Sequence, residues 1–253
     1  MHFLRQNALL LSLVLISSLA PAQNFRTGDQ LLRAMHQRYQ ASWYQTITFT
    51  QKSTTYKPDG ASRAETWYEA ALLPGKLRID IGPPEKENGY VMVDGNVTIV
   101  KDGKITGSRR SVNMLLVLGF DVYRQDPETT INVVKGEGYD LSKLHDDVWE
   151  GRAAYVVGAD EGDLKSKQFW VAKDTLLFVR EIEPAHEDPK KLDDIRFTNY
   201  QPLAKAWVAA RVEVYSEDRL VFSEDYSNIQ ADVKLSPAVF DPQQFSSTHW
   251  ENR

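Results

Sequence analysis

The stretch LLPGKLRIDIGPP, residues 72–84, determines how the rest of the chain is interpreted. In it Leu77, Ile79 and Ile81 alternate strictly with Lys, Arg and Asp, between a Pro-Gly pair and a Gly-Pro-Pro triplet. Side chains of a strand point alternately to its two faces, so this pattern predicts a short strand with one apolar and one polar face. The apolar face requires a cover, which other segments of the chain must supply.

Similar strand patterns occupy most of the chain. Turn pairs such as Asp94-Gly95 and Asp102-Gly103 separate them, and such short connections favour antiparallel hairpins. We expect about eleven strands. The expected strand regions are 46–57, 62–73, 76–81, 89–93, 96–101, 147–160, 166–184, 194–203 and 207–230, followed by a short tail at 236–245.

Helical signals are confined to two places. Residues 28–43 carry an apolar stripe with a period of four, and Thr27-x-x-Gln30 before it resembles a capping box. In the middle of the chain, 111–120 is apolar and uncharged, and a short helix is expected from Pro127 to Gly136. This central interruption between two strand blocks is the expected position of a lid or plug.

Antiparallel strands in this number form a sandwich, a closed barrel or a curved open sheet. Only the third arrangement uses every segment. We therefore predict a mainly β (α+β) fold, in which a single strongly curved antiparallel sheet forms an incomplete barrel. The N-terminal helix and the central segment are expected to cover its concave face.

The first 22 residues predict a secretory signal. Arg5 precedes the apolar run 8–19, and Ala20-Pro21-Ala22 is a small-residue cleavage site. We expect residues 23–253 to form one domain. The chain has no Cys, so it has neither disulfides nor a lipid-bearing Cys after the signal. These features predict an exported, soluble protein, best placed in a bacterial periplasm.

The sequence contains little that indicates catalysis. The four His residues after the signal are isolated, and neither a nucleophile elbow nor a phosphate loop is present. The acidic clusters at 146–147, 160–163 and 181–183 fit solvated turns better than paired catalytic carboxylates or a calcium site. The net charge of −5 with no basic patch excludes nucleic-acid binding. We expect no enzymatic activity, metal or cofactor.

The order of several motifs resembles the LolA/LolB-like superfamily of outer-membrane lipoprotein-sorting proteins. The motifs are FTQ (49–51), LLPGKLRIDI (72–81), VMVDGNVTIV (91–100), FWVAKDTLLFVREIE (169–183), IRFTNYQPL (195–203) and VFDPQQF (239–245). The resemblance implies a curved half-barrel whose concave face holds acyl chains. It also implies a lipid or acylated lipoprotein as cargo, with a donor at the inner membrane and an acceptor at the outer membrane.

Without a lipid-bearing Cys, the soluble LolA type of carrier fits better than the anchored LolB type. An RseB-like regulatory module that senses a lipid or partner is the alternative. Among the arginines, Arg63 is the candidate for holding a lid, and Arg78 is expected to face outward. The predicted lining of the cavity, for which plain core packing is the alternative, is Phe49, Trp67, Leu77, Ile79, Ile81, Met92, Ile99, Met114, Leu115, Leu118, Phe120, Phe169 and Val179.

Overall fold

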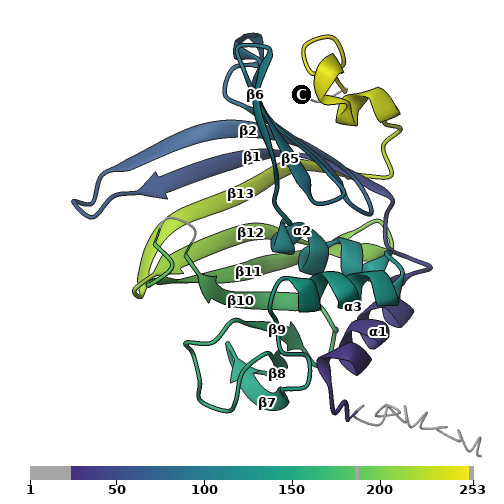
Figure 1. Cartoon of the computed structure of the whole chain (residues 1–253), viewed down its shortest axis with the longest axis vertical. Coiled ribbons are helices and arrows are strands. Elements are labelled where there is room, and N and C mark those ends of the chain that lie inside the picture. Colours follow the sequence, from purple (N-terminus) through teal and green to yellow (C-terminus); the bar gives the residue numbers. More distant parts are fainter. Residues whose placement is uncertain (1–23, 186–187, 251–253) are drawn as a thin grey trace, which may run out of the picture.

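The computed structural model describes residues 24–185 and 188–250, so the predicted signal peptide at 1–22 lies outside the described residues. In the described part, one antiparallel sheet has the strand order β6-β5-β4-β3-β2-β1-β13-β12-β11-β10-β9-β8-β7. The two end strands, β6 and β7, do not pair, so the sheet is open. It curves around three helices, as Figure 1 shows. The predicted fold class is confirmed.

The first half of the chain builds one wing of the sheet, moving outward from β1. The predicted number of about eleven strands is too low, because the sheet has thirteen. The prediction missed β6, a largely exposed edge strand whose side chains show no apolar alternation. The strands of this wing are β1 (Thr46–Tyr56), β2 (Ser62–Leu72), β3 (Lys76–Ile81), β4 (Asn88–Val93), β5 (Asn96–Lys101) and β6 (Lys104–Arg110).

The second half begins at the opposite edge and returns strand by strand to β1. The pairing of β1 with β13 joins the two wings. The tail at 236–245 forms two short 3-10 turns, η3 (Pro237–Phe240) and η4 (Pro242–Gln244), and no strand. The strands of this wing are β7 (Leu144–Trp149), β8 (Arg152–Val157), β9 (Gln168–Ala172), β10 (Phe178–Pro184), β11 (Leu192–Leu203), β12 (Ala206–Ser216) and β13 (Arg219–Ala231).

The predicted hairpin turns have the backbone geometry that their sequences favour. Asp94, Asp102 and Glu150 all have φ between 47° and 49°, and each is followed by a Gly with positive φ. Two consecutive residues with positive φ match the right-handed twist of the flanking strands. These pairs therefore connect neighbouring strands in antiparallel order.

The helices lie between the two wings because the chain must cross from β6 to β7. The crossing segment contains α2 (Met114–Gly119), the 3-10 turn η2 (Asp121–Tyr123) and α3 (Pro127–Gly136), which has the predicted bounds. The N-terminal helix α1 (Gly28–Tyr39) ends four residues before the predicted end. Side chains of all three α-helices share one buried cluster with the strands. The helices therefore cover the inner face of the sheet.

The outer face of β3 is also buried. Arg78, expected to face outward, is fully buried under the C-terminal segment 235–250. Its guanidinium pairs with Asp80 at 2.8 Å and donates to the carbonyl oxygens of Phe245 and Thr248, both at 2.7 Å. Arg78 therefore faces outward as expected, but it is buried because the C-terminal turns return across the polar face of this strand.

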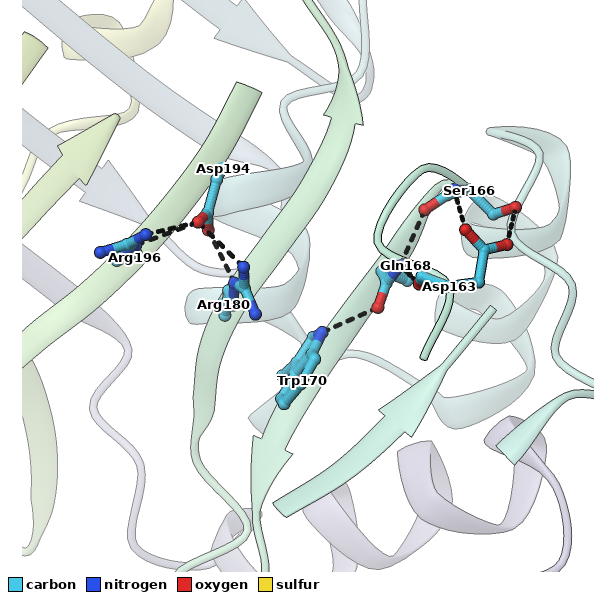
Figure 2. A network of polar contacts seen from close by, with 7 residues as sticks. All are labelled: Asp163, Ser166, Gln168, Trp170, Arg180, Asp194 and Arg196. Atoms are coloured by element: carbon cyan, nitrogen blue, oxygen red, sulfur yellow. Dashed lines mark hydrogen bonds and ion pairs between the residues drawn. The ribbon is translucent and has the colours of Figure 1, made fainter. Parts of the chain in front are cut away.

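A polar network covers the outer face of the other wing. Figure 2 shows Asp194 between Arg180 and Arg196, with distances of 2.7 Å to each. Nearby, the indole N–H of Trp170 donates to Gln168 at 3.0 Å. The Arg180 guanidinium lies 4.8 Å from the Trp170 ring centre, so a cation–π contact links the two groups.

Candidate functional site

A cavity lies between α2 and the inner face of the sheet where the two wings meet. Its empty volume is about 520 Å³, part of which opens to solvent. Most of its wall is aliphatic or aromatic. The lining residues are Ile47, Phe49, Trp67, Glu69, Ala71, Leu77, Ile79, Asn113, Leu115, Leu116, Phe120, Phe197, Glu224 and Tyr226.

Strand register explains why these side chains meet. Phe49 on β1 pairs with Glu69 on β2, and Glu69 pairs with Ile79 on β3. Directly paired residues of antiparallel strands point to the same face. The apolar side chains of β3 therefore point to the same face as the paired side chains of β1 and β2. For this reason Leu77 and Ile79 line the cavity.

The opposite wall is the short apolar helix α2. The Asn113 side chain caps it by accepting a hydrogen bond from the backbone N–H of Leu116 at 3.1 Å. At its other end, a Cβ on Gly119 would lie 2.8 Å from the Phe197 ring of β11. The close approach of this backbone to the sheet requires a residue without a side chain.

Six of the thirteen residues predicted to line the cavity do so: Phe49, Trp67, Leu77, Ile79, Leu115 and Phe120. They come from the inner faces of β1–β3 and from α2 with the residue that follows it. For these six residues, the face predicted from the sequence is the face that lines the cavity in the structure.

The other seven predicted residues lie elsewhere. Met114, Leu118 and Phe169 are buried in the main core, and Ile81 packs against it while partly exposed. Met92 lines a second cavity beside α3. Ile99 is on β5, in register with the inner-face residue Tyr90 of β4, but outside the cavity lining.

Val179 was assigned to the wrong face. It belongs to a separate buried cluster with Trp170 and Val156 on the outer face. A register shift between Phe178 and Arg180 interrupts the alternation of β10 against β9. Because a one-residue slip reverses the two faces, sequence periodicity alone misplaced this side chain.

Arg63 does not hold the helices. Its side chain is 75% exposed and pairs with Glu65 on the same strand at 2.5 Å. Other residues tie the crossing segment to the sheet and to the loop that follows α1. The Arg124 guanidinium donates to the Trp43 carbonyl oxygen at 2.7 Å, and the Asp121 carboxyl accepts from the Gly75 N–H at 3.1 Å.

Asp121 stands at the second cavity, which lies between the β4–β5 hairpin and the helices α2 and α3. It is 1% exposed, and burial raises the pKa of its carboxyl to about 7 although the Gly75 N–H partly opposes the rise. This buried carboxyl therefore fastens the start of η2 to the β2–β3 turn.

Sequence reasoning missed the polar groups of the first cavity. Burial and the charge of Glu224 raise the pKa of Glu69 well above its ordinary value. Burial raises the pKa of Glu224 to about 7, and hydrogen bonds from Tyr226 and Gln51 hold it lower than burial alone would. The alternation of β2 and β13 could have placed each Glu on a face, but only the pairing of both strands with β1 brings them together.

In residues 24–185 and 188–250, no group of three or more His, Cys, Asp and Glu side chains could hold a metal ion. Every helix in the same residues is too short or too polar to cross a lipid bilayer.

The fold and the cavity define a curved-sheet half-barrel with an internal, mostly apolar cavity under helices. No protein-family model matches the sequence, and no curated protein matches it. Solved structures do match, and three of them match over most of both chains. Together they show that the chain has the LolA-like fold.

A LolA superfamily protein from Nitrosomonas europaea is 13% identical with a TM-score of 0.53, over 83% of this chain and 96% of that chain. An outer membrane lipoprotein-sorting protein domain from Vibrio parahaemolyticus is 11% identical with a TM-score of 0.59, over 87% and 98%. A DUF1329 family protein from Desulfovibrio piger is 17% identical with a TM-score of 0.56, over 85% and 95%. At these identities the likeness concerns the fold alone.

Proposed function

We propose that this protein is a periplasmic carrier that shelters the acyl chains of a lipid or lipoprotein during transfer toward the outer membrane. The observation that carries the proposal is the apolar cavity between α2 and β1–β3. The LolA-like fold and its likeness to an outer membrane lipoprotein-sorting domain support it. The protein would then be a binding protein and not an enzyme.

The free energy of acyl-chain transfer explains why a carrier needs such a cavity. Exposing a chain to water costs about 0.8 kcal/mol per CH₂, so roughly fifteen methylenes cost on the order of 12 kcal/mol. Walls made of Leu77, Ile79 and Phe120 offer surface that offsets this cost. The cargo must also leave, which requires one wall that can move.

Helix α2 is suited to be the moving wall. It has only six residues, and Gly119 at its end packs closely against the Phe197 ring of the sheet. Displacing it would open the cavity without breaking any strand pairing. We propose that α2 moves outward when cargo enters and that the thirteen-stranded sheet stays in place.

Export belongs to the same proposal. Cleavage of residues 1–22 would release a single domain, 23–253, into the periplasm, where no lipid anchor holds it. A donor at the inner membrane and an acceptor at the outer membrane would then exchange cargo with it. The two partners would meet the protein one after the other.

The test is lipid extraction and native mass spectrometry of the mature protein purified from the bacterial periplasm, together with uptake of a fluorescent fatty acid. We expect co-purifying lipid or saturable uptake. A variant with Ala71→Trp, which fills the cavity from β2, should lose uptake while its circular dichroism keeps the β signal. A protein that carries no lipid and takes up no probe would contradict the proposal.

A further inference from the structure

Two carboxyl groups face the apolar cavity from either side of β1. Glu69 on β2 is 6% exposed, and Glu224 lies on β13. Among the described residues, the cavity lining contains no Lys, Arg or His, and no hydrogen bond or ion pair involves the Glu69 carboxyl. Burying a carboxyl without a partner is unfavourable, so this arrangement is incomplete as it stands.

A third acceptor lies between the two carboxyls. Gln51 on β1 is fully buried, and its Nε2 donates to Ser53 at 2.7 Å. Its Oε1 has no hydrogen-bond partner among the described residues. Gln51 pairs directly with Trp67 and with Tyr226, which both line the cavity, so its side chain is on the same inner face.

Aromatic rings complete this end of the cavity. The rings of Phe49 and Tyr226 stack with centres 4.3 Å apart, and Trp67 stands on the neighbouring strand. The Tyr226 hydroxyl donates to Glu224 at 2.6 Å and does not reach Glu69. The faces of aromatic rings attract cations. The site thus contains aromatic rings and hydrogen-bond acceptors without donors, and no cationic side chain of the described residues lines it.

We propose that the cavity takes an amphiphile with a protonated amine, whose N–H groups meet the oxygens of Glu69 and Glu224, with the unpaired Oε1 of Gln51 behind them. Its alkyl or acyl chain then lies along the apolar wall of β3 and under α2. This inference rests on the proposed carrier function and specifies the chemical class of the cargo. An anionic head group would instead meet two carboxyls and no cation, which is repulsive when either carboxyl is ionised.

The test compares three probes with the same chain, dodecylamine, dodecanol and dodecanoate, the two charged ones below their micelle concentrations and dodecanol below its solubility limit. Isothermal titration calorimetry at pH 8 gives each affinity for the full mature protein. Hydrogen bonds to charged groups are the stronger kind, so we expect dodecylamine to bind at least about tenfold more tightly than dodecanol. Dodecanoate should bind most weakly of the three.

Matched variants separate charge from shape. Replacing both carboxyls, Glu69→Gln with Glu224→Gln, keeps side-chain size, and the affinity for dodecylamine should fall to about that for dodecanol. The control Glu161→Gln removes one negative charge from an exposed turn outside the cavity and should leave the preference unchanged. Thermal melts of each variant establish that it is folded.

The outcomes distinguish the two proposals. Equal affinities for all three probes, or tightest binding of dodecanoate, would overturn the amine inference and leave the carrier function standing. Binding of none of the probes, together with no lipid in the purified protein, would overturn both. Persistence of the amine preference in the double Gln variant would also overturn the inference.

Discussion

At the scale of single residues, Arg78 and Asp80 form a charge pair that the C-terminal segment seals from solvent. Arg78 is fully buried and Asp80 is 3% exposed. The side chain also bonds three backbone carbonyl oxygens, from Val239, Phe245 and Thr248. One arginine therefore attaches the C-terminal turns to β3.

The first prediction concerns this pair. Arg78→Met leaves the Asp80 carboxyl buried without its cation, and we expect a loss of about 3–5 kcal/mol in the free energy of unfolding. Urea unfolding followed by Trp fluorescence measures it. Arg63→Met is the control, because Arg63 is an exposed partner of Glu65 and should cost less than about 1 kcal/mol. Equal losses in the two variants would contradict the account of Arg78.

The second prediction concerns Asp121. Its pKa in the folded protein is about 7, above the ordinary value, so folding favours the protonated carboxyl. The stability contributed by Asp121 is fully present below about pH 4 and is lost as pH rises to about 7. In Asp121→Asn this loss is absent, and the Asn oxygen can still accept from Gly75.

We therefore expect Asp121→Asn to match the wild type near pH 4 and to exceed it at pH 8, by on the order of 2–4 kcal/mol. Urea unfolding at both pH values measures the difference. A variant that is less stable than the wild type at pH 8 would show that the charged Asp121–Gly75 contact outweighs the cost of burial.

At the scale of elements, the glycines that end α2 and α3 differ in what surrounds them. A Cβ on Gly119, at the end of α2, would lie 2.8 Å from Phe197, whereas one on Gly136, at the end of α3, would meet no atom within 4 Å. The first glycine is required for packing. The second is not.

The third prediction uses this difference. Gly119→Ala should push α2 from the sheet and cost about 1–3 kcal/mol, with faster hydrogen exchange at residues 114–120. Gly136→Ala, the matched control, should change stability by less than about 1 kcal/mol. If α2 is the moving wall of the cavity, Gly119→Ala should also speed the release of a bound fluorescent probe. Unchanged exchange in α2 would contradict the packing account.

At the scale of the whole molecule, several buried carboxyls share one direction of pKa shift. Burial raises the pKa of Glu69, Asp121, Glu181 and Glu224. Each stabilises the fold most when protonated, and each loses that contribution as pH rises through its folded pKa. Asp194, with a lowered pKa, acts in the opposite sense and loses its contribution only in acid.

The fourth prediction follows for the entire protein. Its thermal midpoint should be highest near about pH 5 and should fall by several degrees between about pH 5 and pH 8. Differential scanning calorimetry across this range measures it. Combining Glu69→Gln with Asp121→Asn should flatten the fall. A midpoint that rises over the same range would contradict the assignment of raised pKa values.

The sequence by itself determined every strand except β6, as well as the tight turns, the helix of residues 127–136 and the open curved sheet. These features depend on side-chain period and on turn residues, which act between near neighbours in the chain. For the same reason it located the cavity wall formed by Leu77 and Ile79, since alternation on adjacent hairpin strands keeps one face common.

Only the tertiary structure decided the rest of the site. It brought Glu69 and Glu224 to one cavity through their separate pairings with β1, and it buried Arg78 by returning the C-terminal segment over β3. It also turned Val179 outward at a register shift. The physical reason is common to all three. Which charge loses its water, and which face a strand turns inward, depend on partners far along the chain that local periodicity does not encode.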